Sequence, residues 1–365
     1  TAMSEWANFR SIASTSGWSG RAGQVHNSYS HDRSPGGSSS GSGAAASACL
    51  AAATIGTETD GSIVSPATAN GVVGLKPTVG LTSRRGVVPI SSSQDTIGPL
   101  ARSVADAAAV LTAIAGPDEG DPATAGVEVH DYSACVDGDG LRGARIGVAR
   151  RLFGFSDHAD KAVEAALETM RAAGAILVEI DTLVVDEELE AAEGVVLLHE
   201  FRVGLNEYLA TRSSGSPRSL AEVIEFNTNN ADVELQHFGQ DTLEASEATG
   251  STSDRRYLKA VDTITRLAKT EGLDRAFDAH EVDAIVAPTG APASPIDLVN
   301  GDRHIGGSAT LAATAGYPLI SVPVALVAGL PVGITFMGTA WSEPVLIKLA
   351  SGFEAARGPL PAPDI

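Results

Sequence analysis

Cysteine and aromatic residues are scarce in this sequence. Its two cysteines, Cys49 and Cys135, cannot build a disulfide framework, and no CxxC pair or Cys/His group has the spacing of a zinc site. Cys49 follows a run of alanines, so we expect it to be a small buried apolar side chain. Aromatic residues make up 5% of the chain and hydrophobic residues 43%. Aliphatic side chains and alanine must therefore fill a substantial core.

Basic residues are also few. The 25 Lys and Arg residues stand against 45 Asp and Glu residues, which gives a formal net charge of -20. Such a surface repels phosphate backbones, so we expect no nucleic-acid partner. No uninterrupted apolar run reaches the ~20 residues that a membrane span needs. The compartment stays open between the cytoplasm and a secreted or periplasmic location.

Residues 145–180 carry the clearest secondary-structure pattern. A short apolar run is followed by Val163, Leu167 and Met170 on one helical face, then by Gly174 as a helix end and a second apolar run. This order predicts a strand–helix–strand unit. Such a unit implies a parallel or mixed sheet with helices on its faces, and therefore an α/β fold.

The chain is expected to form a single domain, 1–365, built from unlike stretches. Residues 1–145 and 281–365 are punctuated by Gly and Pro and predict strands that share one sheet. Residues 186–280 are mostly helical and acidic, and we expect a cap-like insertion there. Further strands are predicted at 72–75, 284–287, 319–324 and 332–337, and helices at 103–115, with Ser103 as N-cap, and 343–356.

A Gly/Ser-rich stretch at 35–43 precedes the alanine-rich segment 44–53. Taken alone, Gly/Ser-rich sequence indicates a flexible linker. The alanine run favours a helix instead, and a Gly/Ser loop that opens onto a helix presents backbone N–H groups and the positive end of the helix dipole. The pair of segments is therefore interpreted as a binding loop.

A second segment, 56–63, reads Gly-Thr-Glu-Thr-Asp-Gly-Ser-Ile. Nucleophilic attack on a carbonyl needs a nucleophile, a proton carrier and donors for the developing oxyanion, and a serine after a Gly-containing turn can supply the first and the last. The G-x-S-x-G elbow is missing around Ser62 and the histidines are scattered, which disfavours a histidine triad. Glu58 and Asp60 are interpreted as carboxylates that hold the loop by hydrogen bonds rather than as a general acid–base pair.

The Gly/Ser stretch at 35–43 and the segment 56–63 resemble two loops of the amidase signature family. Its Gly/Ser loop has the form GGSSGGS, and its nucleophile loop has the form T-[DE]-x-x-G-S-[IV]. Ser40 and Asp60 stand where the family more commonly has glycine. Segments 71–78, 91–96, 283–289 and 329–333 fit as well, so the resemblance covers the whole chain. Segments 57–63 and 91–96 are similar to the peptide-amidase-like branch.

The resemblance implies a mixed central sheet flanked by helices on both faces. It places the nucleophile on Ser62, a bridging serine with a cis peptide on Ser38, and a supporting serine on Ser39. It assigns the oxyanion hole to the backbone amides of Thr59, Asp60, Gly61 and Ser62. It implies neither a cofactor nor a metal.

The proton carrier of the family is a lysine on a strand well upstream of the serine loop. Residues 1–8 resemble the stretch that follows this lysine, so the catalytic lysine is expected outside this chain, and activity is expected to depend on it. Lys76 belongs to a Leu-Lys-Pro-Thr turn and is interpreted as structural.

The resemblance implies hydrolysis of a carboxamide, the C-terminal amide of a short peptide or a small amide, to an acid and ammonia or an amine through an acyl-enzyme on Ser62. The protein would be a monomer or homodimer with a small-molecule or short peptide amide as substrate. Three alternatives stay open: the glutaminase-type A subunit of an amidotransferase, an inactive truncated relative that only binds, and, more distantly, a histidine-triad hydrolase.

Overall fold

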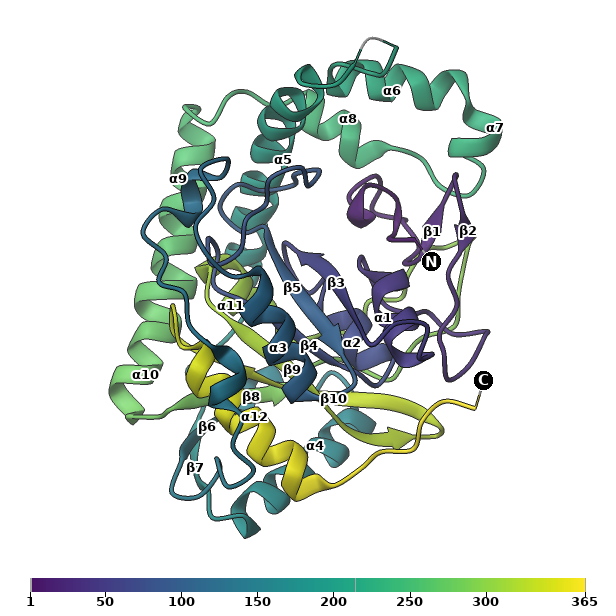
Figure 1. Ribbon diagram of the computed structural model, residues 1–365. Coiled ribbons are helices and arrows are strands. Elements are labelled where there is room, and N and C mark those ends of the chain that lie inside the picture. The colour runs from purple at the N-terminus through teal and green to yellow at the C-terminus, as the bar shows by residue number, and fades with distance from the viewer. Residues whose placement is uncertain (1, 214, 365) are drawn as a thin grey trace.

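The computed structural model describes residues 2–213 and 215–364, and its centre is an eight-stranded mixed sheet (Figure 1). In spatial order the strands are β3 (Ala53–Glu58), β5 (Thr96–Ala101), β4 (Val73–Lys76), β9 (Leu319–Val327), β10 (Leu330–Met337), β8 (Ala284–Pro288), β6 (Arg145–Ala149) and β7 (Ile176–Ile180). The pairs β6–β7 and β6–β8 are parallel and the others antiparallel. A two-stranded ribbon joins β1 (Trp18–Ser19) to β2 (Gly23–Gln24). The α/β class with a mixed sheet is confirmed.

Strands from both ends of the chain share this sheet, as predicted. Near the middle of the sheet β4 pairs with β9, and Leu75 lies opposite Ile320. The parallel side contains the predicted strand–helix–strand unit, in which α4 (Asp157–Ala172) connects β6 to β7. Gly174 has a φ of +98° just after α4, a left-handed conformation that suits glycine at a helix end.

Helices cover both faces of the sheet. Along β8, Ala284 and Val286 enter one core cluster, whereas Ile285 and Ala287 enter a second one. Because successive strand residues point to opposite faces, the sheet is buried on both sides. The first core contains α3 (Val104–Ile114), α4 and α12 (Glu343–Arg357). The second contains α11 (Thr310–Ala315) and helices from the middle of the chain. As predicted, Ser103 caps α3, and its side chain accepts a hydrogen bond from the Asp106 amide.

Between β7 and β8 the described residues form helices. They are α5 (Glu187–Ala210), α6 (Leu220–Asn229), α7 (Ala231–Glu234), α8 (Asp241–Glu247), α9 (Arg255–Ile264), the π-helical segment Thr265–Asp274 and α10 (Arg275–His280). In the view of Figure 1, α6, α7 and α8 lie at the top and α4 at the bottom. A third apolar cluster joins α5, α6 and α8 to Ile90. The predicted helical content of 186–280 is confirmed, and its role as a cap stays a prediction.

The start of the alanine-rich helix was predicted wrongly. Helix α1 spans Ser40–Ser47, so it begins inside the Gly/Ser stretch and ends before Ala53, the first residue of β3. Cys49 has a φ of +56° and turns the chain toward β3, which exposes its side chain. The expectation of a buried Cys49 is therefore also wrong. Alanine content favours a helix but does not fix the residue at which it ends.

The remaining short elements are α2 (Val64–Ala69) and single 3-10 turns at Glu5–Asn8, Pro122–Thr124, Tyr132–Cys135 and Arg150–Leu152. Over the described residues, no helix combines the length and the apolar character that crossing a bilayer requires.

Candidate active site

The loop that carries Ser62 lies between β3 and α2. Glu58, the last residue of β3, is buried, and its Oε2 accepts the amides of Ile63 and Val64 at 2.7 and 3.0 Å. Gly61 has a φ of +77°, so the chain can turn back on itself here. The Glu58 carboxylate thus closes residues 59–62 into a fixed arc, which confirms its interpretation as a structural group. Burial raises the pKa of Glu58, against the attraction of Lys76.

Two further carboxyl groups, one in this arc and one outside it, connect the arc to its surroundings. Asp60 accepts a hydrogen bond from the Thr310 hydroxyl at 2.8 Å, and burial raises the pKa of Asp60. The Thr59 hydroxyl donates to Asp95 at 2.6 Å. Burial raises the pKa of Asp95 to about 6. The hydrogen bond of Asp60 agrees with its predicted role in holding the loop.

The backbone amides in this arc are available to a ligand. Within the described residues, the N–H groups of Asp60, Gly61 and Ser62 form no hydrogen bond to a protein acceptor. Free backbone N–H groups beside a serine can stabilise a developing oxyanion where they converge on one point. The oxyanion role of the Thr59–Ser62 amides stays a prediction.

The Gly/Ser loop lies directly against this arc. The Ser39 amide donates to the Ser62 carbonyl at 3.1 Å. The Ser39 hydroxyl donates to the Thr57 carbonyl at 3.0 Å and accepts the Thr57 amide at 3.1 Å. The peptide bond between Gly37 and Ser38 is cis, as the resemblance implies. Both segments singled out in the sequence therefore meet at one place, with Ser39 as the connection.

Ser38 is the least satisfied polar residue of this loop. It is 1% exposed, and its hydroxyl forms no hydrogen bond within the described residues. In particular, the structure forms no bond between the hydroxyls of Ser38 and Ser62. The backbone contact brings the two loops together, but the catalytic roles of Ser38 and Ser62 stay predictions.

Lys76 ends strand β4 and is fully buried. Its ammonium donates to the Tyr317 carbonyl at 2.6 Å. Burial lowers the pKa of Lys76 to about 8, against the attraction of Glu58 and Glu343. This bond ties β4 to the turn before β9, in agreement with the structural interpretation of Lys76.

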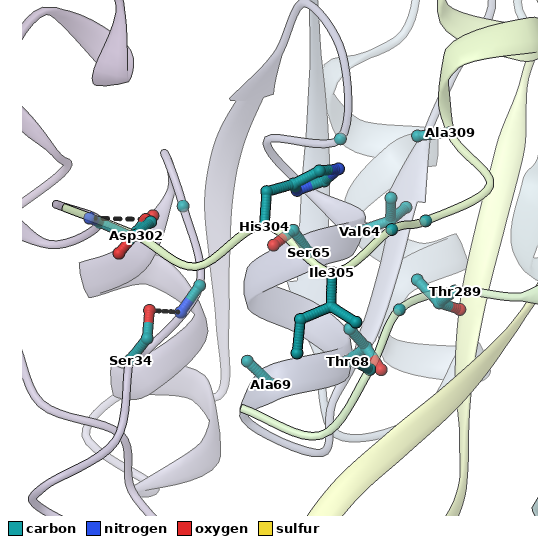
Figure 2. A pocket seen from close by; sticks show the side chains of 18 of the residues that line it. Ser34, Val64, Ser65, Thr68, Ala69, Thr289, Asp302, His304, Ile305 and Ala309 are labelled. Carbon is teal, nitrogen blue, oxygen red and sulfur yellow. Dashed lines mark hydrogen bonds between the residues drawn. The ribbon is translucent and has the colours of Figure 1, made fainter. Parts of the chain in front are cut away.

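A cavity of about 490 Å³ opens beside the two loops (Figure 2). Its walls combine the Gly/Ser loop, the Ser62 loop, α2 and the segment 289–310. The lining side chains drawn and labelled in Figure 2 are Ser34, Val64, Ser65, Thr68, Ala69, Thr289, Asp302, His304, Ile305 and Ala309. A volume of this size suits a small ligand or a few amino-acid residues.

Sequence reasoning missed the far wall of this cavity. His304 and Ile305 lie over α2, and Asp302 accepts the Ser16 amide at 2.9 Å. Glu190 of α5 reaches the same cavity. These residues come from segments far apart in the sequence and belong to no local motif, so only the fold brings them together.

Comparison with other proteins shows the family to which this chain is similar. The family model described as Amidase matches residues 1–347. A protein of Arabidopsis thaliana named "Probable amidase" is 38% identical over 364 residues, which is 97% of this chain and 66% of that protein. The A subunit of glutamyl-tRNA(Gln) amidotransferase from an Anaeromyxobacter species is 36% identical over 365 residues, covering 93% of this chain and 70% of the subunit. The chain spans 61% to 66% of the length of the first curated relatives it matches.

Solved structures extend the comparison to the whole chain. The native peptide amidase of Stenotrophomonas maltophilia is 50% identical with a TM-score of 0.94, and the match covers 100% of this chain and 74% of that one. A structure of peptide amidase with the competitive inhibitor chymostatin is 51% identical with a TM-score of 0.95, covering 100% and 75%. Sequence motifs, family match and fold agree, and the chain belongs to the amidase signature family.

Proposed function

We propose that this protein hydrolyses the C-terminal amide of short peptides, or related small amides, to an acid and ammonia or an amine. The contact that carries the proposal is the Ser39–Ser62 backbone bond, which holds the Gly/Ser loop against the serine loop beside a cavity of about 490 Å³. The likeness to peptide amidase, which covers the whole chain, supports a peptide amide as substrate.

In the proposed reaction Ser62 attacks the amide carbonyl, and the free amides of the arc stabilise the oxyanion. One such donor is worth about 2.7–4 kcal/mol in transition-state stabilisation. Ser38 transfers a proton from Ser62 toward the leaving nitrogen, and water then releases the acyl group from Ser62. The proton carrier in this proposal is the lysine of the family. Lys76 does not take this role, because its ammonium is bound to the Tyr317 carbonyl.

The test is ammonia release from a short peptide amide, with intact-mass analysis after an acid quench. In protein that contains the lysine of the family, we expect an acyl adduct on the wild type and none on Ser62→Ala, whose rate should fall at least 1,000-fold. Ser133→Ala is the matched control, because Ser133 is exposed and lies on a distant 3-10 turn. An active Ser62→Ala variant would contradict the nucleophile assignment.

A small tertiary amine in the assay, which can carry a proton but forms no stable amide with the acyl-enzyme, tests the proton carrier separately. A rate that rises with amine concentration would indicate that the base is not supplied by the residues of this chain. Replacing Lys76 by Met serves as the counter-test, because a structural lysine affects stability rather than the amine dependence.

The A subunit of a tRNA-dependent amidotransferase is the second candidate, supported by 36% identity to such a subunit. That function predicts that free glutamine is hydrolysed in preference to peptide amides and that another chain copurifies. Absence of both hydrolysis and adduct, with binding of amides retained, would instead favour a relative that only binds.

A further inference from the structure

The cavity beside the serine loops has an excess of acidic side chains. Asp60, Glu190 and Asp302 line it, and the basic groups on its wall are Arg303 and His304. The acids come from three separate elements: the serine loop, helix α5 and the segment before α11. Their convergence is therefore a property of the fold rather than of one charged stretch.

Two polar atoms in the cavity wall have no protein partner among the described residues. Thr68 is 4% exposed, and its hydroxyl forms no hydrogen bond. Asp302 uses Oδ2 to accept the Ser16 amide, whereas its buried Oδ1 is unpaired. Figure 2 shows the two side chains on different sides of the cavity, with His304 and Ile305 between them. Both atoms are covered, and the Thr68 hydroxyl lies beside those of Ser321 and Thr289 next to Gly333, so the acidic wall is the part of this cavity that offers charge to a ligand.

The groups that face these carboxylates do not neutralise them. The Thr310 hydroxyl donates a hydrogen bond to Asp60, and His304 attracts both Asp60 and Asp302. Lys76 lies behind Asp60, but its ammonium is also attracted by Glu58 and Glu343. The exposed Arg303 forms no ion pair within the described residues.

The pKa of Glu193 also indicates that positive charge is scarce around the cavity. It lies one turn beyond Glu190 on α5, is buried, and accepts the Gln94 side-chain amide at 2.8 Å. Burial, together with repulsion by Asp60 and Glu190, raises the pKa of Glu193 to about 8. At neutral pH this carboxyl therefore holds its proton instead of adding a further negative charge.

We propose that the cavity selects amide substrates that carry an ammonium or guanidinium group close to the scissile carboxamide, with Asp60, Glu190 and Asp302 as the recognising carboxylates. This inference rests on the proposed amidase function and names the substrate class of the same site. The cation would occupy the acidic part of the cavity.

The test compares dipeptide amides of matched length that end in lysine, norleucine or glutamate. We expect kcat/KM for the lysine amide to exceed that for the norleucine amide by at least tenfold and the glutamate amide to be the poorest. The preference should shrink as NaCl is raised from 0.02 to 0.5 M. Glu190→Gln and Asp302→Asn should each lower the lysine-to-norleucine ratio about tenfold. Glu225→Gln, an exposed carboxylate on α6, is the control and should leave the ratio unchanged.

Two outcomes separate this inference from the proposed function. Equal or reversed preference, or an unchanged ratio in both cavity variants, would overturn the cation site while leaving the amidase function intact. If no amide is hydrolysed, the proposed function fails, and calorimetric binding of Nα-acetyl-lysinamide against Nα-acetyl-norleucinamide decides the inference. Tighter binding of the lysine amide supports it, and equal binding refutes it.

Discussion

At the scale of single residues, neighbouring serines of the Gly/Ser loop should behave in opposite ways. Ser38 has a buried hydroxyl without a partner among the described residues, whereas the Ser39 hydroxyl makes two hydrogen bonds to Thr57. Ser38→Ala should lower kcat/KM at least 100-fold, because it removes the proposed proton relay. It should not lower the free energy of unfolding, because it removes a desolvated group that forms no bond. Ser39→Ala should lower that free energy by about 1–3 kcal/mol, because it leaves buried backbone groups unpaired.

Urea unfolding and amide hydrolysis measured on both variants check this contrast. A large loss of stability in Ser38→Ala would mean that its hydroxyl has a structural partner, and an active Ser38→Ala variant would remove it from the mechanism.

Single residues also show where sequence reasoning succeeds. Glu58 could be interpreted correctly because its partners, Ile63 and Val64, lie only a few residues away. Asp302 and His304 could not be found, because nothing in their own segment links them to α2. The prediction that Cys49 is buried was wrong for a local reason, because its left-handed backbone follows from where α1 ends.

At the scale of elements, the close approach of α1 to β3 depends on Gly56. A Cβ atom there would lie 2.8 Å from the Ser39 hydroxyl and 2.7 Å from Leu100. Gly56→Ala should therefore push Ser39 away from β3, destabilise the protein by about 1–3 kcal/mol and lower activity by at least tenfold. Gly194→Ala is the matched control, because Gly194 is an exposed residue inside α5 with open space around it. It should raise stability by about 0.5–1 kcal/mol.

Thermal unfolding and peptide-amide kinetics on the two variants give the comparison. A Gly56→Ala protein with wild-type activity would show that the contact between α1 and β3 does not position the serine loops.

Helices with a strong apolar periodicity were predictable from the sequence. The residues at which helices begin and end were less predictable. The apolar face of α4 and the cap of α3 are visible in the sequence because both depend on residues within one or two turns. The boundaries of α1 depend on tertiary contacts instead, such as the bond from the Ser42 hydroxyl to the Ile55 carbonyl of β3.

At the scale of the whole molecule, strand order was the part that the sequence left open. It was predictable that both chain ends contribute to one sheet. It was not predictable that β5 lies between β3 and β4, because alternation and turn residues define strands but not their neighbours. The far wall of the cavity could not be predicted for the same reason, because it depends on how residues 289–310 fold back over α2.

The buried carboxyl groups make the stability of the whole molecule depend on pH. Glu193 has a pKa raised from 4.5 to about 8 and Asp95 from 3.8 to about 6, so both bind protons more tightly in the folded state. Their stabilising contribution is full below the unfolded values and is lost as pH rises through the folded values. Asp121 has the opposite sign. The hydrogen bond from Arg84 lowers its pKa to about 2, so its contribution is lost as pH falls below 3.8.

Stability should therefore be greatest near pH 4–5 and decline toward pH 8, because a pKa that differs by one between the folded and unfolded states corresponds to about 1.4 kcal/mol. Lys76 adds no slope below about pH 7, because its ammonium is charged in both states there, and it opposes the decline only as the pH approaches its folded pKa of about 8. Glu193→Gln keeps a group that can accept the Gln94 bond but has no proton to lose, so it should flatten the decline between pH 6 and 8.

Calorimetric melting temperatures at pH 3, 5, 6.5 and 8 measure the profile, with Glu225→Gln as an exposed control that keeps the wild-type slope. A wild-type melting temperature that rises from pH 5 to 8, or a Glu193→Gln profile parallel to the wild type, would show that Glu193 ionises normally and that the carboxylates around the cavity do not repel one another.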